Sequence, residues 1–183
     1  MIALIIIVIV LVVLVAYVIG TYNSLVNVKN KVEDQWSQID VVLKNRNDLI
    51  PNVVETVKGY AKHEKETLNA VIESRNKATS AKNAEEEMKA AGEVTEALGK
   101  LFALAENYPD LKANQNFMDL QNKLNEVEEK IRFARQFYND TVMEYQNKLE
   151  MFPSNIVAKM FGFKPKTFFE ASEEERKNVE VKF

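Results

Sequence analysis

The chain has 183 residues, with 27 acidic and 24 basic side chains, one histidine and no cysteine. This length suits one folded domain with a small appendage, and a hydrophobic content of 46% with charges of both signs excludes a disordered chain. The lack of cysteine excludes disulfides, thiolate metal sites and thiol nucleophiles. The basic residues form no stripe that would neutralise a row of phosphates, so we expect no nucleic-acid binding.

The N-terminal segment is apolar throughout. Residues 2–19 carry no polar side-chain group besides the Tyr17 hydroxyl, and the first charged side chain is Lys29. As a helix this stretch would extend about 27 Å, close to the hydrocarbon thickness of a bilayer. A cleaved signal peptide would instead need a basic start and a small-residue cleavage site, which this segment lacks. We therefore predict a retained single-pass transmembrane anchor over residues 1–21, with residues 2–19 in the lipid bilayer.

The charges beside this anchor indicate its orientation. The nearest basic side chains, Lys29 and Lys31, both lie on its C-terminal side. Because basic flanking residues stay on the cytoplasmic side of a membrane, these lysines favour a cytoplasmic location for the rest of the chain.

Residues 22–153 show helical periodicity. Their apolar residues recur at steps of three and four, and the rhythm is most regular between Phe117 and Phe152. The first helix should fade near Ser80, and Asn83 should cap the next one, whose first turn is acidic. The predicted fold class is all-α: an N-terminal transmembrane helix that continues into an elongated antiparallel up-and-down helical bundle.

Pro51 interrupts the first helical pattern. Inside a helix, proline cannot donate to the carbonyl four residues earlier and costs about 3 kcal/mol. Either one long helix kinks at Pro51, or a new helix begins there with Asp48 as its cap. We favour the kink, because the apolar spacing keeps its phase from Leu43 through Ile50 to Val57.

Residues 154–183 differ from the preceding stretch, and we predict a short helix followed by an irregular tail. Four phenylalanines of this stretch would form an adhesive patch if they were solvated. Either they clamp the tail onto the bundle, which we favour, or they dip into the nearby membrane interface. These residues are Phe161, Phe163, Phe168 and Phe169.

The sequence contains no recognisable catalytic or metal-binding set. His63 is the only histidine, whereas a carboxylate-bridged di-iron bundle or a zinc protease needs at least two. The serines lie in no nucleophile elbow, and the scattered glycines form no phosphate-binding loop. We therefore expect neither enzymatic activity nor a cofactor.

Several polar residues fall within or beside the apolar seams. Buried charges have to be paired, so we expect interhelical ion pairs that fix the register of the bundle. The alternative is a groove for a ligand or a partner. The residues in question are Asp40, Arg46, Arg75, Arg135 and Asn139.

Several blocks of the sequence resemble the LemA family. They are Trp36 to Val41 (WSQIDV), Asp48 to Tyr60 (DLIPNVVETVKGY), His63-Glu64, Ala105 to Asn114 (AENYPDLKAN), and Ala134-Arg135 with Tyr138-Asn139. The resemblance covers nearly the whole chain and implies a single-pass protein of the bacterial inner membrane with a mostly helical cytoplasmic domain. It implies no particular reaction. Within these blocks, the further candidate structural or partner-contact residues are Trp36, Asp48, Pro51, Tyr108 and Pro109.

These observations favour a membrane-anchored helical scaffold or adaptor without catalytic activity. Its partners would be other membrane or membrane-associated proteins, or copies of itself. One alternative is a membrane sensor or signal transducer in which the anchor helix passes strain to the bundle through the kink at Pro51. A second alternative is a weak enzyme or metal protein centred on His63.

Overall fold

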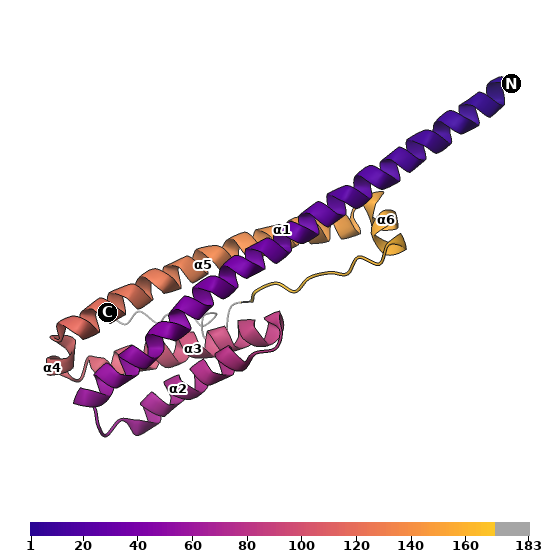
Figure 1. Cartoon of the computed structure of the whole chain (residues 1–183). Helices are drawn as coiled ribbons and strands as arrows, with labels where there is room; N and C mark the ends of the chain where they lie inside the picture. The colour runs from indigo at the N-terminus through magenta and orange to yellow at the C-terminus, as the bar shows by residue number, and fades with distance from the viewer. Residues whose placement is uncertain (171–183) are drawn as a thin grey trace, which may run out of the picture. The chain divides into compact units, whose positions relative to one another are not determined.

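The structure, a computed structural model, describes residues 1–170 as helices and connecting segments (Figure 1). No strand occurs within these residues, which confirms the all-α prediction. The helices are α1 (Ile2–Tyr60), α2 (Lys65–Ser80), α3 (Ala84–Ala105), α4 (Pro109–Lys112), α5 (Gln115–Glu150) and α6 (Ser154–Met160).

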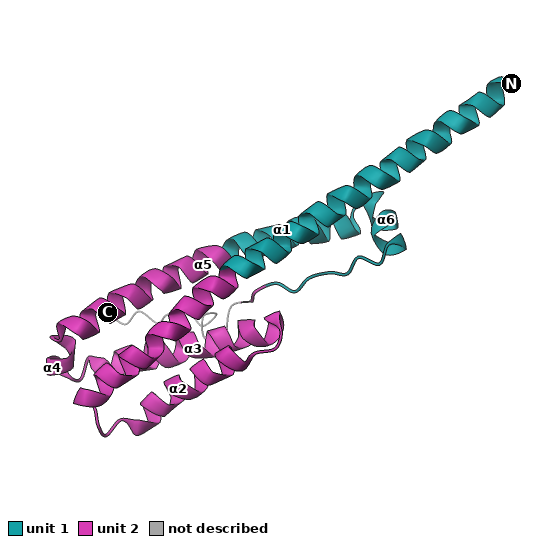
Figure 2. Ribbon diagram, in the orientation of Figure 1, with its two compact units in different colours: residues 1–38, 136–168 teal, residues 39–135, 169–183 magenta. Residues whose placement is uncertain are grey.

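The chain divides into two compact units (Figure 2). Unit 1 comprises residues 1–38 and 136–168, and unit 2 comprises residues 39–135 with the described residues from Phe169 onward. The long helices α1 and α5 contribute residues to both units.

In unit 1, α1 and α5 run antiparallel. Lys148 Nζ, near the end of α5, donates to Ser24 Oγ at 2.6 Å. Earlier in α5, the Tyr138 ring lies 5.6 Å from the ring of Trp36, which comes later in α1. Helix α6 packs back onto α1, where its Val157 and Ala158 form a buried cluster with Leu25.

The N-terminal part of α1 is apolar and exposed. Its large side chains from Ile2 to Val15 are between 51% and 77% exposed. An 18-residue window of this helix has a mean hydropathy of 3.7, and none of that window is buried. By length and composition this is one candidate membrane span among residues 1–170. The helix continues from it without a break, as predicted.

Unit 2 is a helical bundle around one core. Within it, α1 and α5 again run antiparallel, since Arg46 contacts Glu128 of α5 while Tyr60, at the end of α1, contacts Asn114 just before α5 begins. Helices α2 and α3 form a hairpin, which the ion pair between Lys77 and Glu93 bridges at 2.8 Å. The core is formed by Ile50, Val53, Val54, Val57, Ala61, Leu68, Val71, Val94, Ala97, Leu98, Leu101, Ala105, Leu111, Phe117 and Leu124.

The prediction that the first helix continues to Ser80 is wrong. Helix α1 ends at Tyr60, and a turn closed by the Glu64 amide donating to the Ala61 carbonyl leads into α2. Ala61, in the turn, is buried in the core, so the apolar periodicity of the sequence continues through the turn. Periodicity alone therefore does not reveal that the helix ends at Tyr60. The reversal lets α2 bury Leu68 and Val71 in the same core.

Helix α1 passes through Pro51 without interruption. The alternative in which Asp48 caps a new helix is therefore wrong, because Asp48 lies inside α1 with an exposed side chain. Pro51 is exposed as well, so its ring meets solvent.

The predicted cap of α3 is confirmed. The Asn83 side-chain oxygen accepts from the Glu86 amide at 2.9 Å, and the Glu86 carboxylate accepts in return from Asn83 Nδ2 and from the Lys82 amide. This reciprocal arrangement satisfies amide groups that a helix N-terminus leaves unpaired.

The predicted short helix after Pro153 is confirmed as α6, followed by an irregular segment to residue 170. Phe163 packs against the Leu25 cluster, and Phe169 is 5% exposed beneath Arg135, so these two rings do clamp the segment. Phe161, by contrast, is 51% exposed. The rest of the predicted tail, residues 171–183, lies outside the described residues.

Candidate functional site

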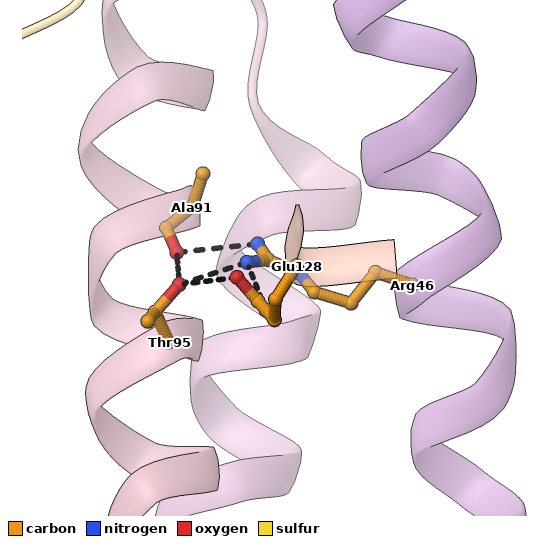
Figure 3. Close-up of polar contacts among 4 residues, drawn as sticks. All are labelled: Arg46, Ala91, Thr95 and Glu128. Carbon is orange, nitrogen blue, oxygen red and sulfur yellow. Dashed lines mark hydrogen bonds and ion pairs between the residues drawn. The ribbon is translucent and has the colours of Figure 1, made fainter. Parts of the chain in front are cut away.

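The most buried charged group of unit 2 is the Arg46 guanidinium, at the centre of a polar cluster between three helices (Figure 3). Arg46 Nη1 donates to Glu128 Oε1 of α5 and to Thr95 Oγ1 of α3, both at 2.9 Å. Arg46 Nη2 donates to the Ala91 carbonyl at 3.2 Å. The Thr95 hydroxyl also donates to the Ala91 carbonyl at 3.1 Å. Because the Arg46 guanidinium of α1 donates to groups of both α3 and α5, it ties these three helices together.

The Arg46 side chain is 0% exposed, so it is inaccessible to solutes. The Glu128 side chain is 29% exposed. Burial is the largest influence on this guanidinium and lowers the pKa of Arg46, and the Glu128 carboxylate opposes that shift. A fully buried cation whose two Nη groups donate to protein oxygens can hold helices in register, but it cannot meet a ligand. The predicted interhelical ion pair at Arg46 is thus present, with Glu128 as its partner.

Pro51 and Arg75 are linked through one backbone oxygen. Proline has no amide hydrogen, so Pro51 leaves the carbonyl of Asn47, four residues earlier, without its helical donor. Arg75 Nε, from α2, donates to that carbonyl at 2.9 Å. A charged donor from a neighbouring helix therefore replaces the hydrogen bond that proline removes. Arg75 binds a backbone oxygen here, where the sequence predicted an ion pair.

Asp40 pairs with another carboxyl group. The Glu87 carboxyl of α3 is half-buried and shares a hydrogen bond with Asp40. Burial, and then the charge and hydrogen bond of Asp40, raise the pKa of Glu87 from 4.5 to about 7. Because the folded-state pKa lies above the unfolded one, the protonated pair favours folding. That contribution is complete below about pH 4.5 and is lost as the pH rises through about 7.

Residues 35–183 match the sequence profile of the LemA family. The chain belongs to the LemA family. The match confirms the resemblance seen in the sequence blocks, and it begins at residue 35, after the candidate span of α1.

The chain is similar to proteins of three bacteria. Protein LemA of Metamycoplasma hominis is 26% identical over 166 residues, which cover 89% of this chain and 75% of that protein. Magnetosome protein MamQ 2 of Paramagnetospirillum magneticum is 23% identical and covers 85% of this chain and 67% of its own length. Magnetosome protein MamQ of Magnetospirillum gryphiswaldense is 22% identical, with 81% and 64% covered.

The LemA-like blocks around residues 48–64 and 105–114 meet at one end of unit 2. The Tyr108 hydroxyl donates to Glu64 Oε1 at 2.9 Å, and this hydrogen bond raises the pKa of Tyr108. Asn114 Nδ2 donates to the Tyr60 hydroxyl at 2.9 Å. Pro109 occupies the first position of α4, where its missing amide hydrogen has no cost. These two hydrogen bonds therefore hold the turn between α1 and α2 against the segment between α3 and α5.

A groove of about 600 Å³ opens in unit 2 between the end of α1 and α2. Its apolar lining includes Val54, Leu68 and Ile72, and Ile72 is 39% exposed. Its basic lining consists of Lys58, Lys62 and Lys65, with Glu55 as the acidic residue. The sequence reasoning did not find this groove, because it exists only once the turn after Tyr60 brings α2 beside α1.

The remaining candidate residues make other contacts. Trp36 is half-buried against Tyr138 in unit 1, where Asn139 is half-buried too. The Arg135 guanidinium lies 4.2 Å from the centre of the Phe169 ring in unit 2. With Glu128, Arg135 also lines a surface hollow of about 290 Å³. His63 is exposed, and no group of metal-binding side chains is found within residues 1–170.

The sequence reasoning missed Glu128 and Glu87 as partners in these contacts, and it did not assign Arg75 to the Asn47 carbonyl. Glu128 directly follows the apolar position Val127, as several other glutamates follow apolar positions, so no local signal distinguishes it. The Asn47 carbonyl, in contrast, carries a readable signal, because a proline at position 51 always leaves that oxygen without its helical donor.

Proposed function

We propose that this LemA family protein is a membrane-anchored scaffold or adaptor. It binds other membrane or membrane-associated proteins, or a second copy of itself, and performs no catalysis. The observation that carries the proposal is the open groove of unit 2, whose apolar floor and lysine side chains suit a protein segment better than a small substrate.

The lining of this groove indicates the chemistry of its partner. Ile72, which is 39% exposed, offers an apolar side chain to the hydrophobic face of a helix or an extended segment, and the buried Leu68 lies at the floor of the groove. Lys58, Lys62 and Lys65 outnumber Glu55, so the groove attracts acidic residues. Lys58 and Glu55 lie on the same helix and form an exposed ion pair at 3.2 Å, so this pair is weak and Lys58 can exchange it for a carboxylate of the partner. The partner is therefore an amphipathic segment with acidic flanks.

Site-specific crosslinking in cells tests this proposal. A photoreactive side chain at position 62 should yield crosslinked species, whereas the same group at Lys123, which is exposed on α5, should yield none. Lys65→Glu should remove the crosslink from position 62, because it reverses a charge in the groove. Crosslinks of equal yield from both positions, or none from either together with a strictly monomeric protein in mild detergent, would contradict an adaptor role.

We further propose that residues 2–19 span the bacterial inner membrane and that the following residues face the cytoplasm. Lys29 and Lys31 support this orientation under the positive-inside rule. The cysteine-free sequence allows a clean test with a single introduced cysteine, Lys123→Cys. A membrane-impermeant maleimide should label it only after the cells are lysed, and labelling in intact cells would refute the orientation.

A second candidate function is a membrane sensor, and it is favoured by the continuity of α1 through Pro51. A helix without a break can carry a displacement along its axis, and the contact from Arg75 to the Asn47 carbonyl joins α2 to that helix beside the proline. For a sensor, Pro51→Ala should change the crosslinking yield at position 62 while the helical content stays the same. An unchanged yield in a folded variant would reject the sensor.

A further inference from the structure

The corner between α5 and α6 in unit 1 exposes a concentrated apolar surface. Five large apolar side chains within eleven residues are between 51% and 80% exposed, and α6 contributes two of them. Such a patch on a solvated turn would be a liability for aggregation. The five residues, called here the corner patch, are Met151, Phe152, Ile156, Met160 and Phe161.

Helix α6 is apolar on two opposite sides. Val157 and Ala158 are buried against Leu25 of α1, so one side of α6 serves the core of unit 1. Ile156 and Met160 are 57% and 60% exposed on the other side. A short helix whose second apolar side is exposed needs an apolar environment beyond its core contacts.

The depth of α6 relative to the candidate span follows from its contacts. Val18, which belongs to the apolar residues 2–19, packs against the cluster of Leu25, Val157 and Ala158. Helix α6 therefore lies beside the last turn of the span, and Figure 1 shows it next to α1 and the end of α5.

The contact between Tyr22 and Phe161 gives the same depth. Their ring centroids are 4.8 Å apart. Tyr22 comes three residues after the end of the apolar stretch, or about 4.5 Å along the helix axis. The headgroup layer of a bilayer is thicker than this distance. If residues 2–19 fill the hydrocarbon, Phe161 lies within the interfacial layer, where aromatic side chains are enriched.

Cationic and hydroxyl side chains of unit 1 are close to the corner patch in the sequence. Lys159 and Lys164 are exposed. Lys148 lines a hollow of about 380 Å³ in unit 1 with Thr21, Ser24 and Ser154. An ammonium group among hydroxyls is suited to a phosphate group, and interfacial helices commonly combine such cations with an apolar face.

We propose that the corner patch inserts into the interfacial layer of the same bilayer that α1 spans, with Lys148 and Lys159 facing phospholipid headgroups. This inference rests on the proposed membrane anchoring by residues 2–19 and adds a second membrane contact to it. Two contacts prevent unit 1 from rotating about the axis of a single spanning helix, so they set the orientation of unit 1 on the membrane.

The test uses the full chain, reconstituted in vesicles of phosphatidylcholine with phosphatidylglycerol as the anionic lipid. Single cysteines at Phe152 or Ile156 carry an environment-sensitive fluorophore, and spin-labelled lipids act as quenchers at the depth of the upper acyl chain. Phe137→Cys is the matched control, because Phe137 is also exposed in unit 1 but lies about 20 Å away along α5. Leu11→Cys reports whether the span is inserted.

We expect the label at position 156 to shift to shorter emission wavelength and to lose most of its fluorescence to the quencher, while the label at 137 keeps its emission. Lys159→Glu should weaken the quenching at 152 in vesicles with anionic lipid and leave it unchanged in phosphatidylcholine alone. Quenching at position 11 with an aqueous environment at 152 and 156 would overturn the second contact and leave the anchor intact. An unquenched label at position 11 would overturn both.

A second copy of the chain is the other occupant that the experiment can reveal. In that case the labels at positions 152 and 156 would shift to shorter emission wavelength only at high protein density, and the spin-labelled lipids would not quench them. That result would assign the corner patch to self-association and would overturn the lipid contact.

Discussion

Removal of the Arg75 guanidinium should destabilise unit 2 by an amount that depends on the residue at position 51. Arg75 Nε is the donor that the structure provides for the Asn47 carbonyl, whose helical donor is missing because of Pro51. In Arg75→Met the aliphatic stem remains but this carbonyl loses its partner. In Pro51→Ala the alanine amide can donate to the same carbonyl, so the arginine becomes less necessary.

The magnitude follows from the cost of a lost charged hydrogen bond. Hydrogen bonds to charged groups contribute about 1.5–3 kcal/mol, so Arg75→Met should lower the free energy of unfolding by about 2 kcal/mol. In the Pro51→Ala background the same change should cost about 0.5–1 kcal/mol, because a backbone hydrogen bond takes over. The coupling energy between positions 51 and 75 is then about 1–1.5 kcal/mol, within the range expected for residues that share a partner.

Urea unfolding of the full chain in mild detergent, followed by far-ultraviolet circular dichroism, measures these four proteins. With a slope of about 2 kcal/mol per molar urea, the loss in Arg75→Met should move the midpoint by about 1 M. Arg132→Met is the matched control, because Arg132 is 67% exposed beside Glu129 and its loss should change stability by less than about 0.5 kcal/mol. An equal cost of Arg75→Met with proline or alanine at position 51 would refute the reasoning.

Further predictions concern the other polar contacts of unit 2. Glu128→Ala leaves the fully buried Arg46 cation without its counter-ion and should cost about 3–5 kcal/mol, whereas the double variant with Arg46→Met should recover much of that loss in urea unfolding. Between pH 5 and 8 the wild type should lose about 1 kcal/mol as Glu87 ionises, since solvent screens part of the effect of a half-buried carboxyl. Glu87→Gln should flatten that profile, and an unchanged slope would show that other groups titrate. Asn83→Ala should lower the free energy of unfolding by about 1 kcal/mol and speed amide hydrogen exchange in the first turn of α3. Asn83→Asp should leave the stability and the exchange rate unchanged. A wild-type exchange rate in Asn83→Ala would contradict the capping role.

Much of the fold could be predicted from the sequence because its signals are local. The apolar run of residues 2–19, the helical period and the Asn83 cap each depend on neighbours within a few turns of the same helix. Pro51 likewise indicates by itself that the Asn47 carbonyl needs a new donor. Membership of the LemA family was also readable, since its blocks are contiguous stretches of sequence.

The tertiary structure alone decided which groups meet. The turn after Tyr60 was hidden because Ala61 keeps the apolar phase, and only the packing of Leu68 and Val71 into the core shows that the chain reverses there. The choice of Glu128 for Arg46 depends on how α1 and α5 are rotated and shifted against each other. Periodicity says which face of a helix is buried, but the partner of a charge on that face is set by the register between helices, which the packing of the whole core determines.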